Sequence, residues 1–134
     1  MKYAFIDTNV LIDYILNRQG GDDAKQLLMR GQKGDARLSA SFLTFANMAY
    51  IVRGKADVYG LFEMLTQFVD VLPMDERQLQ ATLSKKVRDF EDMLQYQCAK
   101  AAGCEVIITN NKRDFEEFSD WPIMTAEEFL SQTE

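Results

Sequence analysis

The chain has 134 residues, 47% hydrophobic and 27% charged, which is the size and composition of a single globular domain. Its 15 Lys and Arg stand against 21 Asp and Glu, and this net charge of −6 is opposite in sign to that of a basic nucleic-acid clamp. The chain has no histidine, which excludes Ser-His-Asp and Cys-His catalysis and most catalytic zinc sites, and its two cysteines cannot form a Cys₄ zinc site or a disulfide framework.

The chain lacks the patterns of membrane and secreted proteins. No apolar run approaches the roughly 18 residues that a membrane-spanning helix needs. Residues 1–7 carry too short an apolar run, and an acid too early, for a signal peptide. We therefore expect a soluble, cytoplasmic protein with no membrane partner. Its acidic balance serves solubility alone or reflects clustered carboxylates that need a cation.

Short apolar strands alternate with helices along the chain. In chain order, the predicted elements are a strand over 3–6, helices over 8–16 and 23–31, a weak strand over 37–39, helices over 41–52 and 58–69, a strand over 71–73, helices over 76–85 and 89–102, strands over 105–109 and 123–124, and a helix over 126–130. This alternation predicts an α/β fold with a parallel sheet. In such a sheet the functional crevice lies beyond the carboxyl ends of the strands. In the helix over 41–52 we expect an inward stripe of Phe42, Phe45, Met48, Ala49 and Val52.

Polar residues follow the two most apolar strands. Asp7 comes directly after the first strand, and Asn111 and Asp114 come shortly after the strand over 105–109. Each has an ordinary explanation, because Asp is a good helix N-cap and polar residues are common in turns. Since the carboxyl ends of parallel strands share one edge of the sheet, the same residues are also candidates for a common site.

A third acidic segment opens the helix over 89–102. Asp89, Glu91 and Asp92 fall within four positions, and Asp89 and Asp92 share one helical face. Acids in a first turn suit the helix dipole, which is the simpler explanation. However, Asp92 lies beside residues expected to be buried, and carboxylates that converge from separate segments repel one another unless a cation joins them. With oxygen ligands and no histidine, that cation would be Mg²⁺ or Mn²⁺.

Three segments of the chain resemble the signature segments of the PIN-domain family. They are Phe5-Ile6-Asp7-Thr8-Asn9-Val10-Leu11-Ile12-Asp13, Asp89-Phe90-Glu91-Asp92-Met93-Leu94-Gln95 and Ile107-Ile108-Thr109-Asn110-Asn111-Lys112-Arg113-Asp114-Phe115. They come in the family's order, and the ending over 123–130 also fits. The resemblance covers the chain from Tyr3 to about Leu130.

The resemblance implies a fold, an activity and partners. The implied fold is one PIN-like domain over residues 1–134, a three-layer α/β/α sandwich with a short parallel sheet. The implied activity is that of an Mg²⁺- or Mn²⁺-dependent endoribonuclease, the toxin of a VapC-type toxin–antitoxin pair. Its partners would be an RNA substrate, a cognate antitoxin and a second copy of the chain in a homodimer.

The resemblance also assigns roles to individual residues. The metal ligands would be Asp7, Asp89, Asp92, Asn111 and Asp114. The four aspartates among them would also be the catalytic acids. Asn111 falls where many members of the family carry a fourth acid. Asn9 would orient the first acid, and Thr8, Asn9 and Thr109 would position water and phosphate through hydrogen bonds.

One position departs from the family pattern. The family usually has a Glu near the start of the helix over 41–52, and this chain has Asn47 there. An Asn can bind a metal through its carbonyl oxygen but brings no charge. We expect Asp89 to supply the missing charge.

Basic residues flank the candidate acids in the sequence. Lys85, Lys86 and Arg88 precede the acidic helix, and Lys112 and Arg113 follow Asn111. Such residues are exposed in most proteins and need no function. Their position beside the acids favours a role in binding RNA.

Two other functions are consistent with the sequence. The departures at Asn47 and Asn111 are consistent with a PIN-like module that binds RNA or a protein partner at a weakened metal site without cutting. A phosphatase or a CheY-like receiver would use the same α/β layering. The lysine that a receiver needs after a late strand is not evident, and a receiver would leave the Asp89–Asp92 cluster unexplained.

Overall fold

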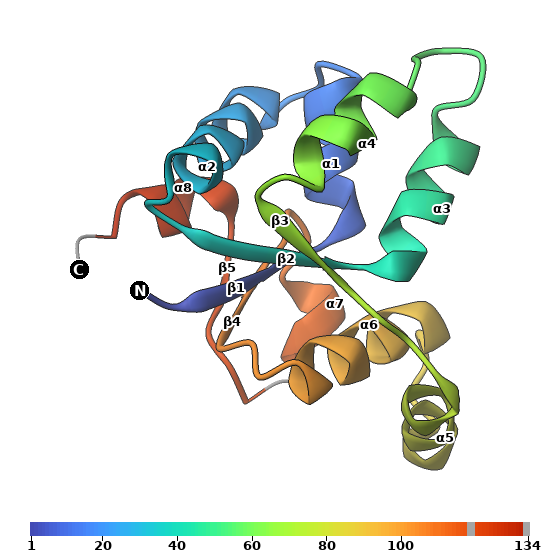
Figure 1. The fold of residues 1–134 in the computed structure, drawn as a ribbon. Coiled ribbons are helices and arrows are strands. Elements are labelled where there is room, and N and C mark those ends of the chain that lie inside the picture. The colour runs from blue at the N-terminus through green and yellow to red at the C-terminus, as the bar shows by residue number, and fades with distance from the viewer. Residues whose placement is uncertain (118–119, 133–134) are drawn as a thin grey trace.

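The computed structural model describes residues 1–117 and 120–132. Its centre is one sheet of five parallel strands in the order β3-β2-β1-β4-β5 (Figure 1). The strands are β1 (Tyr3–Ile6), β2 (Arg37–Ser41), β3 (Val69–Leu72), β4 (Val106–Ile108) and β5 (Ile123–Met124). The predicted α/β fold with a parallel sheet is confirmed. The chain runs outward from β1 to β3 and then crosses back to β4, so the strand order reverses between β1 and β4, where α/β proteins form their crevice.

Helices cover both faces of the sheet, which gives three layers (Figure 1). One layer contains α1 (Thr8–Ile15), α2 (Gly21–Lys33), α3 (Phe42–Ile51), α4 (Tyr59–Leu65) and α8 (Ala126–Leu130). The other contains α6 (Phe90–Ala101) and α7 (Arg113–Glu116), with α5 (Glu76–Lys85) packed beside α6. The predicted sandwich is therefore confirmed.

The two-residue period of the strands explains why the sheet carries helices on both faces. In β1, Ala4 and Ile6 pack into the core beneath α1 and α2, whereas Tyr3 and Phe5 face the layer of α6. All four are buried, because successive side chains point to opposite faces and each face is covered. A continuous apolar run is therefore what this strand requires.

Several boundaries differ from the sequence-based expectations. Helix α4 ends at Leu65 rather than continuing to Val69, and β3 begins at Val69 because that residue pairs with Leu38 of β2. Helix α2 is longer at both ends than predicted, and the short helix α7 was not predicted at all. The pairing of strands overrides local helical periodicity at the α4–β3 junction.

The inward stripe of α3 is narrower than predicted. Met48 and the following Val52 are fully buried, and Phe45 packs against the same core. Phe42, expected to face inward, is 67% exposed, and the fully buried residue of the first turn of α3 is Thr44. None of the helices within residues 1–117 and 120–132 combines the length and the apolar composition of a membrane span.

Candidate functional site

Asp7 occupies the reversal point of the sheet, at the carboxyl end of β1. Its exposed fraction is 5%, and its backbone N–H donates to the carbonyl of Ile108 in β4. Although Asp7 holds the N-cap position of α1, its side chain makes no capping hydrogen bond. Instead, the hydroxyl of Thr109 donates to Oδ2 of Asp7 at 2.8 Å, and the backbone N–H of Asn111 donates to that hydroxyl at 3.1 Å. The carboxylate is thus held by the β4 side of the crevice, and capping does not explain it.

The surroundings of Asp7 favour its protonated form. Burial raises the pKa of Asp7 from its ordinary 3.8 to about 6. The hydrogen bonds from Thr109 and from the backbone of Thr8 lower this pKa, and the negative charges of Asp114 and Glu91 raise it. A carboxylate in this position is short of positive charge.

The beginning of α6 brings a second carboxylate toward Asp7. Asp92 is half-buried, and burial, followed by the charges of Asp7, Asp89 and Asp114, raises its pKa from 3.8 to about 8. Asp7, Asp92 and Asp114 come from three separate elements, α7 carrying the last. The structure therefore brings together these three of the predicted site acids.

Asp89 lies at the edge of this group and caps the beginning of α6. It is the N-cap of α6, and its Oδ1 accepts a hydrogen bond from the backbone N–H of Asp92 at 3.0 Å. Its side chain is exposed. The helix-terminus explanation considered for Asp89 accounts for the orientation of its carboxylate.

Glu91 is the carboxylate that lies against Asn47. The amide of Asn47 donates to Oε1 of Glu91 at 2.9 Å. Although much of Glu91 is exposed, partial burial of its carboxylate raises its pKa, as does the charge of Asp89. Glu91 in turn raises the pKa of Asp7. Sequence analysis did not single out Glu91, because within a run of acids nothing distinguishes the one that reaches across to α3.

A surface hollow of 670 Å³ opens beside these acids. Its lining includes Asp114, together with Arg88, Asp89, Phe90, Glu91, Arg113 and Glu117. Among the residues that the structure describes, no lysine or arginine forms an ion pair with Asp7, Asp92 or Asp114. The negative charge of the group is therefore not neutralised by the protein itself.

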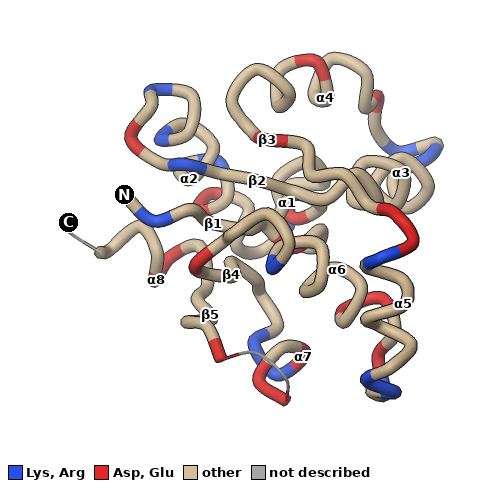
Figure 2. The backbone as a smooth tube through the Cα atoms, turned by 60° about the horizontal axis from the view of Figure 1, so that its bottom comes forward, with Lys and Arg blue, Asp and Glu red and all other residues tan. Residues whose placement is uncertain are grey.

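The five predicted RNA-binding cations have different surroundings. Figure 2 shows a basic stretch at the end of α5 and acidic residues at the beginning of α6. Arg88 and Arg113 line the hollow, and Lys85 and Lys86 are exposed at the end of α5. Lys112 forms an ion pair with Glu128 of α8 at 3.0 Å. Of the five, the two arginines are therefore the ones that line the hollow beside Asp114.

Of the remaining predicted site residues, Thr8 has a buried side chain, whereas the side chains of Asn9 and Asn111 are exposed. The Thr8 hydroxyl bonds to the Thr44 hydroxyl at 2.9 Å, both side chains being buried. Asn9 is exposed, and within the described part of the chain its side chain makes no hydrogen bond to Asp7. Asn111 contacts the network through its backbone, and its side chain is exposed.

The chemistry of the donors suits a hard divalent cation. The group offers carboxyl oxygen atoms, lies at the reversal point of the sheet, and has raised pKa values that a bound cation would lower. Within residues 1–117 and 120–132, however, no three Asp, Glu or Cys side chains form a ready-made ligand group. A cation bound here would require the carboxylates to turn toward it.

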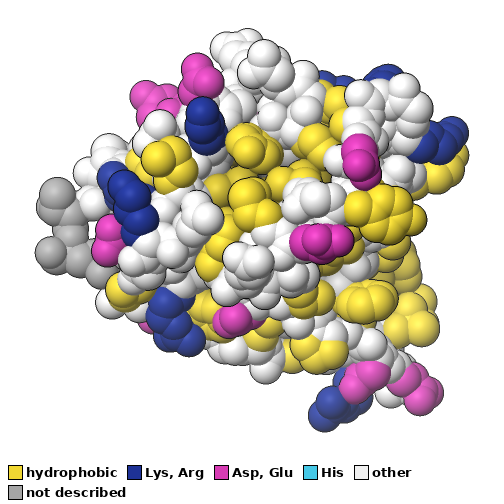
Figure 3. Space-filling view, turned by 45° about the horizontal axis from the view of Figure 1, so that its top comes forward, with side chains coloured by type: hydrophobic (Ala, Val, Ile, Leu, Met, Phe, Trp, Pro, Cys, Tyr) yellow, Lys and Arg dark blue, Asp and Glu magenta, His cyan; other side chains and the backbone are white. Residues whose placement is uncertain are grey.

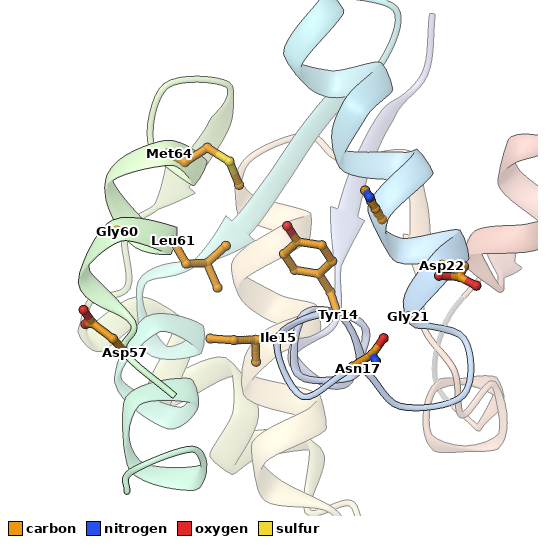
Figure 4. Close-up of a pocket in the computed structure, with 10 residues that line it drawn as sticks. Tyr14, Ile15, Asn17, Gly21, Asp22, Asp57, Gly60, Leu61 and Met64 are labelled. Carbon is orange, nitrogen blue, oxygen red and sulfur yellow. The ribbon is translucent and has the colours of Figure 1, made fainter. Parts of the chain in front are cut away.

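A second hollow, of 580 Å³, lies between α1, the start of α2 and α4 (Figure 4). Tyr14, Ile15, Leu61 and Met64 surround it, and Asp22 and Asp57 lie at its ends. None of the site acids lines it. Sequence analysis did not predict this hollow, because one of its walls, α4, is distant in the chain from α1 and α2.

Large hydrophobic side chains are exposed near α3 and α4. Phe42, Tyr50 and Tyr59 are each more than half exposed, and Ile51 is 41% exposed. Figure 3 shows hydrophobic side chains gathered toward the right of the molecule, the side on which α3 lies in Figure 1. Aromatic residues are enriched in protein interfaces relative to the rest of the protein surface.

The chain is similar to known proteins over nearly its whole length. A family model described as PIN domain matches residues 3–113. Ribonuclease VapC1 of Aquifex aeolicus (strain VF5) is 28% identical over 140 residues, which cover 96% of this chain and 93% of that protein.

Two solved structures share the fold. One is a toxin–antitoxin complex from Klebsiella pneumoniae, with a TM-score of 0.65 and 22% identity over 92% of this chain and 97% of that chain. The other is VapBC-1 from nontypeable Haemophilus influenzae, with a TM-score of 0.65 and 23% identity over 93% and 98% of the two chains. They confirm the predicted architecture.

Proposed function

Since the chain belongs to the PIN-domain family, we propose that it is a metal-dependent endoribonuclease and the toxin of a toxin–antitoxin pair. The observation that carries the proposal is the convergence of Asp7, Asp92 and Asp114 at the reversal point of the sheet, with no cationic side chain paired to them. The relative named Ribonuclease VapC1 supports the same activity. In this proposal residues 1–134 act as one cytoplasmic domain.

The proposed ligands of the metal are Asp7, Asp92 and Asp114, with Asp89, Glu91 and Asn111 at the margin. A bound Mg²⁺ or Mn²⁺ would polarise the scissile phosphate and lower the pKa of a water molecule. Asp7 would be kept in place by the hydroxyl of Thr109, whose own orientation the Asn111 backbone sets. No side chain need act as a nucleophile, which agrees with a chain that contains no histidine.

Arg88 and Arg113 would bind the RNA backbone beside the acids. Both line the 670 Å³ hollow, and a guanidinium group can hold two phosphate oxygens at once. Their charge would offset the repulsion between the acidic residues and a polyanion. Lys85 and Lys86 would extend this contact, whereas Lys112 is engaged with Glu128.

The proposed partners are an antitoxin and a second copy of the chain. The two structural neighbours are described as toxin–antitoxin assemblies. The exposed aromatic residues Phe42, Tyr50 and Tyr59 offer apolar surface for protein contacts. Size-exclusion chromatography with light scattering, with and without the product of a neighbouring small reading frame, tests both partners.

RNA cleavage measured with Mg²⁺ or Mn²⁺, and with EDTA, tests the activity. We expect cleavage only with metal, and none from Asp7→Asn. Asp22→Asn, which makes the same change at an exposed position of α2, should cleave like the wild type. Metal-dependent cleavage that survives in Asp7→Asn would contradict the assignment of the site.

Binding of RNA without cleavage is the second candidate function. It is favoured by Asn47, a neutral residue that contacts the acidic group through Glu91. RNA bound with micromolar affinity, but left intact at every metal concentration tested, would favour this alternative.

A further inference from the structure

A chain of buried hydrogen bonds crosses the molecule next to the candidate site. The hydroxyls of Thr8 and Thr44 lie 2.9 Å apart, and those of Thr44 and Ser41 lie 3.2 Å apart. The Ser41 hydroxyl donates to Oε1 of Gln95 at 2.6 Å. None of these four residues is more than 5% exposed.

These hydrogen bonds link three of the elements that carry the candidate site, namely the start of α1, α3 and α6. Thr8 follows Asp7 at the beginning of α1, and Thr44 lies one helical turn before Asn47 on α3. Gln95 lies one turn after Asp92 on α6, so the two residues share a face of that helix. The hydrogen bonds therefore connect the supports of Asp7 and Asp92 through the interior.

Fold stability alone does not explain a glutamine at position 95. Its Nε2 is buried and has no hydrogen-bond partner in the described part of the chain, and an unpaired buried donor lowers stability. The Ser41 hydroxyl also accepts from the backbone N–H of Thr44, so it would keep a partner without Gln95. An apolar side chain of similar length would fill the space without burying an unpaired donor.

We infer that Gln95 is a positioning residue for the proposed ribonuclease, which sets the placement of Asp92 relative to Asp7 by tying α6 to the start of α3. The inference rests on the proposed function. Through Ser41 and Thr44, the Gln95 amide joins α6 to the residue that follows Asp7. Because a misplacement of about 1 Å at a reacting centre can lower a rate about 100-fold, such a tie matters for activity more than for folding.

The test compares two identical substitutions on α6. Gln95→Met removes the tie, whereas Gln97→Met removes a buried amide whose Nε2 donates to the sulfur of Met93 at 3.4 Å and which is not part of the hydrogen bonds from Thr8 to Gln95. We expect Gln95→Met to lower kcat for RNA cleavage about 10- to 100-fold with KM little changed. Its unfolding free energy should equal or exceed that of the wild type, and the rise in Tm on adding Mn²⁺ should shrink. Gln97→Met should keep the wild-type kcat and Mn²⁺ response.

Thr44→Val breaks the same series of hydrogen bonds at a second position. It preserves the shape of the side chain and removes the hydroxyl that joins Thr8 to Ser41. We expect a fall in kcat similar to that of Gln95→Met, and a double variant no worse than the more impaired single variant, because both changes break one chain.

Three results would overturn the inference: a wild-type kcat and Mn²⁺ response in Gln95→Met, an equal fall in Gln97→Met, or a kcat that falls only together with stability. If wild-type protein neither cleaves RNA nor gains Tm with Mn²⁺, the proposed function itself fails. The two failures are therefore distinguished by the wild type alone.

Discussion

Replacing Asp7 with Asn should remove a pH-dependent loss of stability. Burial and neighbouring acids raise the pKa of Asp7 from 3.8 to about 6, so the folded protein binds this proton more tightly than the unfolded chain does. Stability is therefore unaffected below pH 4, and it falls as the pH rises from about 4 to about 6. The rise in pKa corresponds to a loss of about 3 kcal/mol above pH 6.

The Asn variant avoids this loss while preserving the local structure. Asn is nearly the same shape as Asp, and its carbonyl oxygen can still accept the hydrogen bond from the Thr109 hydroxyl. The substitution also removes the negative charge of Asp7 near Asp92, which lowers the pKa of Asp92 and favours its ionisation. In metal-free buffer at pH 7, Asp7→Asn should therefore be more stable than the wild type by about 3 kcal/mol.

Urea unfolding from pH 4 to pH 8 in EDTA measures the effect. The free energies of unfolding of wild type and Asp7→Asn should coincide near pH 4 and diverge up to about pH 6. Asp22→Asn, at an exposed position, controls for the loss of one surface charge. Parallel profiles for wild type and Asp7→Asn would refute the argument that Asp7 is a buried acid without a compensating cation.

The remaining predictions concern the metal and the acids of α6. Saturating Mg²⁺ or Mn²⁺, at about 100 times Kd, should stabilise the wild type by about 2.7 kcal/mol, measured as a rise in Tm. Asp92→Asn should lose both this rise and RNA cleavage while its circular dichroism spectrum stays native; wild-type cleavage in this variant would remove Asp92 from the site. Asp89→Ala should lower the unfolding free energy by about 1 kcal/mol and Asp89→Asn by much less, since Asn caps as well as Asp; equal losses would contradict the cap. Glu91→Gln should weaken metal binding in a calorimetric titration. Asn47→Glu should lower the metal-free unfolding free energy, because it places a second negative charge beside Glu91. A more stable Asn47→Glu variant would show that the two side chains are apart.

The sequence by itself determined the layering and the location of the crevice. The short apolar runs of β1 and β4 are typical of strands buried on both faces, and helices between strands favour parallel pairing. Since the carboxyl ends of such strands meet, the positions of Asp7 and Asp114 just beyond them already predicted a shared edge. These features follow from local patterns, which is why they could be predicted.

Only the tertiary structure decided which acids act as structural supports and which converge. Asp89 and Glu91 are two acids of one short run, yet the first caps α6 and the second reaches Asn47. The tie between Gln95 and Ser41 spans 54 positions of the chain. The periodicity of each helix gives the face on which a side chain lies but not the residue of another element that meets it. That partner is set by how the elements pack, because burial and hydrogen bonding between distant segments exist only in the folded chain.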